Sequence, residues 1–239
     1  MAINKLMNNP DEAVADIFDG ATVGVSSFAM KIMSPEALLW AVARKGPKHL
    51  TVVAHGVGLN PKKIERPGVP FFVDHGLWIE RGMVKKLISS FPFAQGLETP
   101  VSTEWKAGRL EVEHLPHGTL ALRLWAAGAG VGGVYIKTGV GTEVDQGKEK
   151  RDIEGETYML EWPLKLDFAL IRAYKADRYG NLVYRGVGRC TSPIYARAAK
   201  IVIAEVDEVV EPGDLDPEDI VTPGIYVHRV VKRPAIVER

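Results

Sequence analysis

Glu143 is the carboxylate whose setting in the sequence most favours chemistry. It lies in a glycine-rich loop, residues 138–147, together with Gly139, Gly141 and Thr142. Glycines in such a loop let backbone N–H groups approach an anionic or thioester group closely. A carboxylate that is oriented and partly desolvated can attack a thioester, forming an acyl anhydride and then a glutamyl thioester. A solvated acid at a loop end is the alternative that the sequence leaves open.

Ser26 and Ser27, followed by Phe28, come directly after a β-branched run at 22–25. The end of a strand suits either a nucleophile or a set of backbone hydrogen-bond donors. The nucleophile-elbow pattern GxSxG needs a second glycine, which the segment 24–28 lacks, so a serine hydrolase is not favoured. We expect backbone N–H donors at this position instead.

Histidine precedes glycine at three places in the chain, and imidazole is a common metal ligand. The pairs are His55-Gly56, His75-Gly76 and His117-Gly118. None of them belongs to an HxH or HExxH arrangement, so the spacing favours no metal site. We expect the first and third pairs to line a pocket as polar contacts.

Two further features have a structural interpretation. Gly128 to Gly133 satisfies the GxGxxG spacing of dinucleotide-binding proteins, but an expected helix precedes it and an expected strand follows it. That fingerprint must follow a strand and open a helix, so a helix C-cap and turn is favoured. Cys190 stands beside the cationic Arg189, a neighbour that suits a reactive thiol, yet a packing role is favoured for a lone cysteine.

Alternating elements early in the chain indicate a parallel sheet. A helix is expected from Asn9-Pro10 to Phe18, a strand at 22–25, a second helix from 34–36 to 45, and a strand at 50–54. Strand, helix and strand within so short a stretch form a βαβ unit.

The rest of the chain continues this pattern. Further strands are expected at 84–90, 110–115, 134–136, 158–160, 168–174, 182–184 and 201–206, with a terminal strand at 225–231 that suits an interface. Helices are expected at 119–127 and 194–199, and 56–82 shows no period. The turn 177–181 between two strand runs is typical of a hairpin, so the fold class is α/β, one domain over 1–239 with a largely parallel, mixed central sheet flanked by helices.

Bulk composition excludes some classes of partner. Lys and Arg together number 30, as do Asp and Glu, so no broad basic field is available for nucleic acid or an anionic membrane. The single cysteine precludes an internal disulfide, and the first residues show no secretory pattern. We expect a cytoplasmic protein that binds a small acyl substrate or a protein partner.

Four stretches carry a resemblance to the alpha subunits of the family I coenzyme A transferases, the group of the 3-oxoacid and 3-oxoadipate enzymes. They are GTLALRLWAAGAG, KTGVGTEV, DFALIRAYKADRYGNLVYR and the tail EPG…PEDI…PGIYV. The resemblance covers nearly the whole chain. It implies transfer of coenzyme A from an acyl-CoA to a carboxylic acid, such as a 3-oxo acid, with coenzyme A as a substrate and no other cofactor.

In this family the covalent glutamate belongs to the beta subunit, within a Ser-Glu-Asn-Gly type of motif, and no asparagine here follows a glutamate. The resemblance therefore implies that this chain has no catalytic residue of its own and pairs with a CoA-transferase beta subunit in a heteromer. The substrate-binding residues that we expect in this chain are Ser26, Ser27, Phe28, His55, Gly56, His117, Gly118, Gly139, Gly141, Thr142 and Glu143.

The chain departs from the family pattern where the acyl group is expected. Ser26 to Ala29 replaces a Gly-Gly-Phe-Gly loop, His55-Gly56 replaces paired asparagines, and His117 replaces a glutamine. Arg189 to Ser192 replaces Arg-Asn-Phe-Asn, while Leu122 and Trp125 replace a Glu and an Arg. Such changes alter selectivity, so a thioester hydrolase or ring-opening hydrolase on the same fold, and a binding protein without chemistry, stay open.

Overall fold

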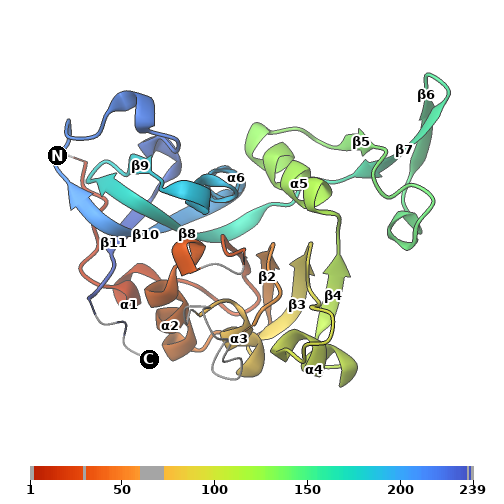
Figure 1. The fold of residues 1–239 in the computed structure, drawn as a ribbon, viewed down its shortest axis with the longest axis horizontal. Helices are drawn as coiled ribbons and strands as arrows, with labels where there is room; N and C mark the ends of the chain where they lie inside the picture. The colour runs from red at the N-terminus through yellow and green to blue at the C-terminus, as the bar shows by residue number, and fades with distance from the viewer. Residues whose placement is uncertain (1–2, 29–30, 60–72, 236, 238–239) are drawn as a thin grey trace.

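The computed structural model describes residues 3–28, 31–59, 73–235 and 237 as a layered α/β fold (Figure 1). Its main sheet has eight strands, seven of them in the order β11-β10-β8-β1-β2-β3-β4, and all neighbours in this order are parallel. The eighth, β9, pairs with β8 in the antiparallel sense, which confirms the hairpin at 177–181 and the mixed sheet.

The strands are β1 (Thr22–Val25), β2 (Leu50–Ala54), β3 (Val84–Ser89), β4 (Glu111–His114), β5 (Val134–Ile136), β6 (Lys150–Ile153), β7 (Glu156–Glu161), β8 (Leu166–Asp177), β9 (Leu182–Val183), β10 (Ala199–Val210) and β11 (Arg229–Lys232). The α-helices are α1 (Pro10–Ala13), α2 (Glu36–Lys45), α3 (Gly76–Glu80), α4 (Pro100–Lys106), α5 (His117–Ala129) and α6 (Ser192–Ala198). Short 3-10 helices are η1 (Lys31–Met33), η3 (Glu143–Asp145), η4 (Gly186–Arg189), η5 (Pro217–Asp219) and η6 (Gly224–Tyr226).

Local sequence explains where several helices start and stop. Asn9 caps α1 by accepting a hydrogen bond from the Glu12 N–H at 2.8 Å, and Pro10 follows it, as expected. The helix ends at Ala13, however, well before Phe18, so its predicted length was wrong. Gly46 ends α2 with a left-handed φ of 72°, the C-cap conformation that glycine adopts at least cost.

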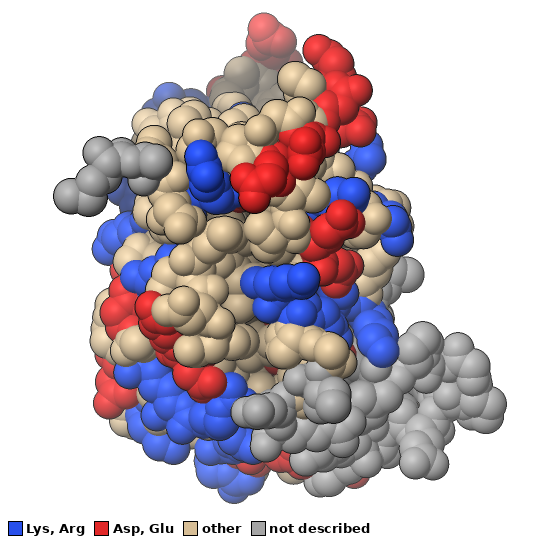
Figure 2. All heavy atoms as spheres, turned by 90° about the vertical axis from the view of Figure 1, so that its left-hand side faces the viewer, with Lys and Arg blue, Asp and Glu red and all other residues tan. Residues whose placement is uncertain are grey.

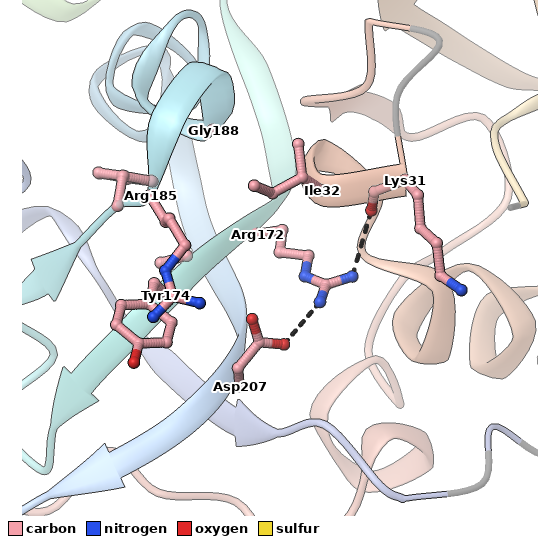
Figure 3. Close-up of a pocket in the computed structure, with 9 residues that line it drawn as sticks. Lys31, Ile32, Arg172, Tyr174, Arg185, Gly188 and Asp207 are labelled. Atoms are coloured by element: carbon pink, nitrogen blue, oxygen red, sulfur yellow. Dashed lines mark hydrogen bonds and ion pairs between the residues drawn. The ribbon is translucent and has the colours of Figure 1, made fainter. Parts of the chain in front are cut away.

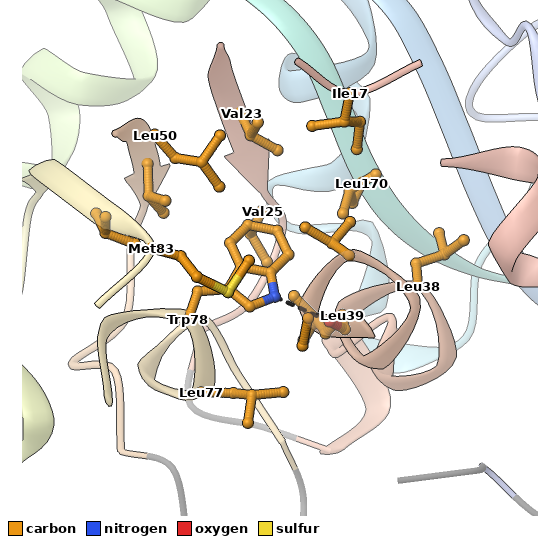
Figure 4. Packing of buried hydrophobic residues seen from close by; sticks show 14 of the residues in the cluster. Ile17, Val23, Val25, Leu38, Leu39, Leu50, Leu77, Trp78, Met83 and Leu170 are labelled. Atoms are coloured by element: carbon orange, nitrogen blue, oxygen red, sulfur yellow. Dashed lines mark hydrogen bonds between the residues drawn. The ribbon is translucent and has the colours of Figure 1, made fainter. Parts of the chain in front are cut away.

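Successive residues of the central strands point to opposite faces of the sheet and so build two cores. Phe168 and Leu170 of β8 join the cluster under α1, α2 and α3, whereas Ala169 and Ile171 join the cluster under α5 and α6. The first cluster surrounds Trp78, whose indole N–H donates to the Leu39 carbonyl at 2.8 Å (Figure 4). Helices therefore cover both faces, as the parallel topology requires.

A second, three-stranded antiparallel sheet, β5-β7-β6, stands apart from the main sheet (Figure 1, upper right). The strands expected at 134–136 and 158–160 exist, but they belong to this small sheet and not to the central one. The terminal strand expected at 225–231 begins only at Arg229, because Gly224–Tyr226 forms η6. Helix α3 lies in the stretch 56–82, of which residues 60–72 lie outside the described part.

Charged side chains of both signs occur in separate groups on the face that Figure 2 shows. Within the described ranges, no helix combines the length and the apolar character needed to cross a bilayer.

Candidate functional site

Three segments of the predicted site meet at one edge of the main sheet. Strands β1 and β2 are parallel neighbours, and Val25 is the register partner of Ala54. Ser26 and His55 are therefore the next residues on adjacent strands. The carboxyl edge of a parallel sheet is where ligands bind in open α/β folds.

Aromatic rings join these strand ends to the start of α5. The Phe28 and His117 rings lie edge to face with centroids 4.8 Å apart, and the His55 and His117 rings do so at 5.0 Å. Tyr195 of α6 contacts His55 from another side, with centroids 5.6 Å apart. We call Phe28, His55, His117 and Tyr195 the strand-end cluster. The structure thus brings together four elements that are distant in sequence.

Both histidines of the strand-end cluster are neutral at pH 7. His55 is only 2% exposed, and burial together with the nearby His117 lowers its pKa to about 4. Partial burial also lowers the pKa of His117 below its ordinary value. Burial disfavours the charged imidazolium, so the cluster offers polar contacts without a formal charge.

The serines lie where the sequence places them, but their backbone groups are already engaged. The Ser26 N–H donates to the Leu170 carbonyl at 3.1 Å, and the Ser27 N–H donates to the Val25 carbonyl at 2.8 Å. We therefore correct the expectation that these two residues present backbone donors. The Ser26 hydroxyl accepts from the Ser192 hydroxyl at 3.1 Å, whereas the buried Ser27 hydroxyl has no partner among the described residues.

The first turn of α5 supplies donors at this edge instead. The helix begins at His117, two residues earlier than expected, so His117 and Gly118 belong to its first turn. Pro116 at the N-cap has no side chain that caps the helix, and the first helical bond is from the Leu120 N–H to the Pro116 carbonyl. The preceding N–H groups have no helical partner, and a helix N-terminus favours an anion or a developing negative charge.

The glycine-rich loop lies elsewhere, in the connection between β5 and β6 of the small sheet (Figure 1). Its Gly141 N–H donates to Asp145 at 2.7 Å, and the Thr142 hydroxyl donates to the Gly139 carbonyl at 2.7 Å, so the loop closes on itself. Glu143 is exposed. Among the described residues, no hydrogen bond, ion pair or ring contact joins this loop to the strand-end cluster. The solvated-acid interpretation of Glu143 therefore fits the structure of this chain better.

A cavity of about 330 Å³ opens between η1, β8, β10 and η4 (Figure 3). Arg172 lines it and is 8% exposed; its guanidinium donates to Asp207 at 2.5 Å and to the Ser34 and Lys31 carbonyls at 3.2 and 3.3 Å. Arg172 thereby ties η1, which follows the Ser26 to Phe28 segment, to β10.

Tyr195 was not among the expected site residues, whereas Ser192 was named only as part of a departure from the family pattern. One signal for Tyr195 exists. Gly24 interrupts the β-branched run of β1, and glycine inside a strand marks a close approach. A Cβ atom on Gly24 would lie 2.6 Å from the Tyr195 ring. Gly24 therefore lets α6 pack tightly enough on β1 for Tyr195 to reach His55.

Three features of the sequence remain: the GxGxxG run, the lone cysteine and the histidines that could bind a metal. Gly128 lies in α5 against the backbone of Arg197, and Gly130 is the left-handed C-cap of α5, which confirms the C-cap interpretation of the GxGxxG run. Cys190 is exposed, so its predicted packing role was wrong.

Within the described ranges, no group of three His, Cys, Asp or Glu side chains is arranged to hold a metal ion, and His75 is not in contact with the other two predicted histidines.

Comparisons with known proteins agree on the family. The coenzyme A transferase family model matches residues 7–233. The chain is 42% identical to the alpha subunit of 3-oxoadipate CoA-transferase of Pseudomonas putida, over 96% of this chain and 94% of that protein. It is 40% identical to the alpha subunit of a probable succinyl-CoA:3-ketoacid coenzyme A transferase of Bacillus subtilis, over 96% and 90%.

Solved structures show the same fold. An acyl-CoA transferase of Escherichia coli superposes with a TM-score of 0.84 at 23% identity; the match covers 100% of this chain and 50% of that one, so this chain spans about half its length. Glutaconate coenzyme A-transferase of Acidaminococcus fermentans superposes with a TM-score of 0.79 at 21% identity, over 96% of this chain and 76% of that one. Fold, full-length match and sequence identity agree, and the chain therefore belongs to the coenzyme A transferase family.

Proposed function

We propose that this chain is the alpha subunit of a family I coenzyme A transferase. It pairs with a beta subunit whose glutamate attacks an acyl-CoA, and coenzyme A then passes, through a glutamyl–CoA thioester, to a carboxylic acid. The two relatives named above, each one subunit of such an enzyme, support this assignment. Coenzyme A enters as a substrate. We place the heteromer in the cytoplasm, in keeping with the single, exposed Cys190.

The observation that carries the proposal is the chemistry of the strand-end cluster. Its neutral imidazoles adjoin the buried Ser26 and Ser27 and the uncapped first turn of α5, while Glu143 is exposed and lies outside it. Such a surface can orient an acyl group and stabilise a thioester oxyanion, but among the described residues it holds no desolvated carboxylate to attack the thioester. We therefore propose that the partner supplies the nucleophile.

Relatives indicate the class of acid. Their names contain 3-oxoadipate and succinyl-CoA with a 3-ketoacid, so we propose a 3-oxo acid as the acceptor. The family has paired asparagines and a glutamine where this chain has His55-Gly56 and His117. We propose that the two histidines contact the acid in their place and determine which acyl group is accepted.

Co-expression with the beta subunit tests the function. The two-chain complex, given succinyl-CoA and acetoacetate, is expected to turn over only when both are present, and mass spectrometry is expected to find coenzyme A on a glutamate of the partner. The chain by itself is expected to show no turnover.

Two outcomes contradict the proposal. Release of free succinate without an acceptor indicates a hydrolase, an activity that the comparisons do not support. Thioester turnover by the isolated chain at an enzyme-like rate places the nucleophile in this chain.

A further inference from the structure

Tyr195 and His55 form a buried pair whose hydrogen bond has only one consistent direction. The Tyr195 side chain is 0% exposed, and its hydroxyl lies 2.9 Å from His55 Nδ1. No other hydrogen-bond partner of this hydroxyl occurs among the described residues. A buried O–H group without an acceptor is costly, so the Tyr195 hydroxyl donates its proton toward Nδ1. Burial raises the pKa of Tyr195 far above its ordinary value, which keeps this proton in place.

The direction of this bond fixes the tautomer of His55. In a neutral imidazole one ring nitrogen accepts and the other carries the proton. Because Nδ1 accepts from Tyr195, Nε2 must carry the proton of His55. Nε2 has no hydrogen-bond partner among the described residues, although His55 is only 2% exposed. A buried N–H group needs an acceptor, and a ligand that enters the site would supply one.

Packing holds the ring in this orientation. The His55 ring meets the Tyr195 ring at 76° and the His117 ring at 84°, so it lies edge to face with a neighbour on two sides. Tyr195 is itself pressed against β1 at Gly24, with no room for a Cβ atom between them. A 180° flip of the His55 ring would place Cδ2 where Nδ1 now lies and would leave the Tyr195 hydroxyl without an acceptor.

We propose that Tyr195 is a positioning residue that locks His55 as its Nε2–H tautomer, so that the site presents a neutral donor and selects a ligand with a carbonyl or carboxylate oxygen there. The identity of that ligand as the acceptor acid rests on the proposed transferase function. The state of His55 does not, because it follows from contacts within this chain.

Nitrogen-15 NMR of the isolated, histidine-labelled chain tests the tautomer, with His55→Gln to assign the resonances. Wild type is expected to show a protonated Nε2 and an unprotonated Nδ1 for His55 at pH 7. Tyr195→Phe, which keeps the ring and removes the hydroxyl, is expected to give a mixture of tautomers. Tyr184→Phe is the matched control, because that buried hydroxyl bonds Thr222 at 2.8 Å and takes no part in the strand-end cluster.

Kinetics of the complex with the beta subunit test the selection. Tyr195→Phe is expected to raise KM for the acceptor acid about twofold, because only the fraction of chains with a protonated Nε2 then presents the donor, with little change in KM for the acyl-CoA. His55→Gln, which keeps an N–H group, is expected to retain more affinity for the acid than His55→Phe.

The experiments distinguish a failure of the tautomer, a failure of the ligand selection and a failure of the proposed transferase function. A protonated Nδ1 in wild-type His55, or a tautomer that Tyr195→Phe does not alter, overturns the inference whatever the activity. An altered tautomer with an unchanged KM for the acid overturns the selection. A wild-type complex without transferase activity, but with the expected NMR signature, contradicts the proposed function and leaves the tautomer established.

Discussion

His55 links the chemistry of the site to the stability of the fold. In the folded chain burial lowers its pKa to about 4, against an ordinary value of 6.5. Between these two values the unfolded chain binds more protons than the folded one, so stability falls as the pH decreases through this window. The full contribution of a neutral His55 is present above pH 6.5.

We predict that wild type loses about 2 kcal/mol more stability than His55→Gln when the pH falls from 7.5 to 5. Urea denaturation at a series of pH values measures this difference. His114→Gln, at an exposed histidine of β4, serves as the control and is expected to follow wild type. Parallel stability curves for wild type and His55→Gln would show that His55 does not couple folding to pH.

The sequence singled out three of the four residues of the strand-end cluster, Phe28, His55 and His117. Phe28 and His55 follow strands that the β-branched runs revealed, and neighbouring parallel strands must end at the same edge. Tyr195 comes from a helix that packs across the sheet, a relationship that depends on tertiary structure. We expected Glu143 to lie with these residues because its loop is rich in glycine. The loop belongs to the small second sheet, however, which is separate from the main one.

Gly24 is the residue through which β1 accommodates α6. A Cβ atom there would lie 2.5 Å from Leu166 Cδ1 and 2.6 Å from Tyr195 Cδ1, closer than real side chains approach. Overpacking of a tight core displaces neighbours and typically costs about 1–3 kcal/mol.

We predict that Gly24→Ala lowers the free energy of unfolding by about 2 kcal/mol, because Leu166 or Tyr195 must move. Chemical denaturation measures the loss. Gly132→Ala is the matched control, since a Cβ atom at Gly132 meets nothing within 4 Å. Equal stability of the two variants would mean that α6 does not depend on close contact with β1.

Elements were predictable where the local pattern was complete. Central strands showed unbroken apolar runs, and the helices opened by Asn9-Pro10 and Ser34-Pro35 had clear start signals. Helix α4 went unnoticed because its capping box pairs Thr99 with Ser102 instead of a Glu or Gln. Strand β6 is exposed along its whole length and exists only through its pairing with β7.

Arg233, near the C-terminal end of the described chain, is bound to two buried carboxylates. Arg233, just after β11, donates to Glu205 at 3.2 Å and to Glu36, and Glu205 also accepts from the Ala37 and Leu38 N–H groups at 2.8 and 3.3 Å. Glu205 is fully buried, which raises its pKa to about 7 although Arg233 and Arg172 oppose the shift.

We predict that Arg233→Ala costs about 3 kcal/mol of stability at pH 8, because it leaves a buried carboxylate without its partner. The cost is expected to be smaller at pH 6, where Glu205 is protonated. The pKa of Glu205 is higher in the folded chain than in the unfolded chain, so the folded protein loses stability as the pH rises from about 4.5 to 7. Without Arg233 the pKa rises further, and this loss of stability continues beyond pH 7. Thermal unfolding at both pH values, with exposed Lys232→Ala as the control, checks this; a cost independent of pH contradicts it.

Leu6 forms a parallel bridge with Val230, and the backbone N–H of Met7 donates to the Val230 carbonyl at 2.9 Å. A segment near the beginning of the described fold therefore lies against β11, which is close to its end. Circular permutation needs such proximity. A permuted gene could join them through a short linker and open new ends at the exposed Glu154-Gly155 turn, leaving each strand of the main sheet with its present neighbours.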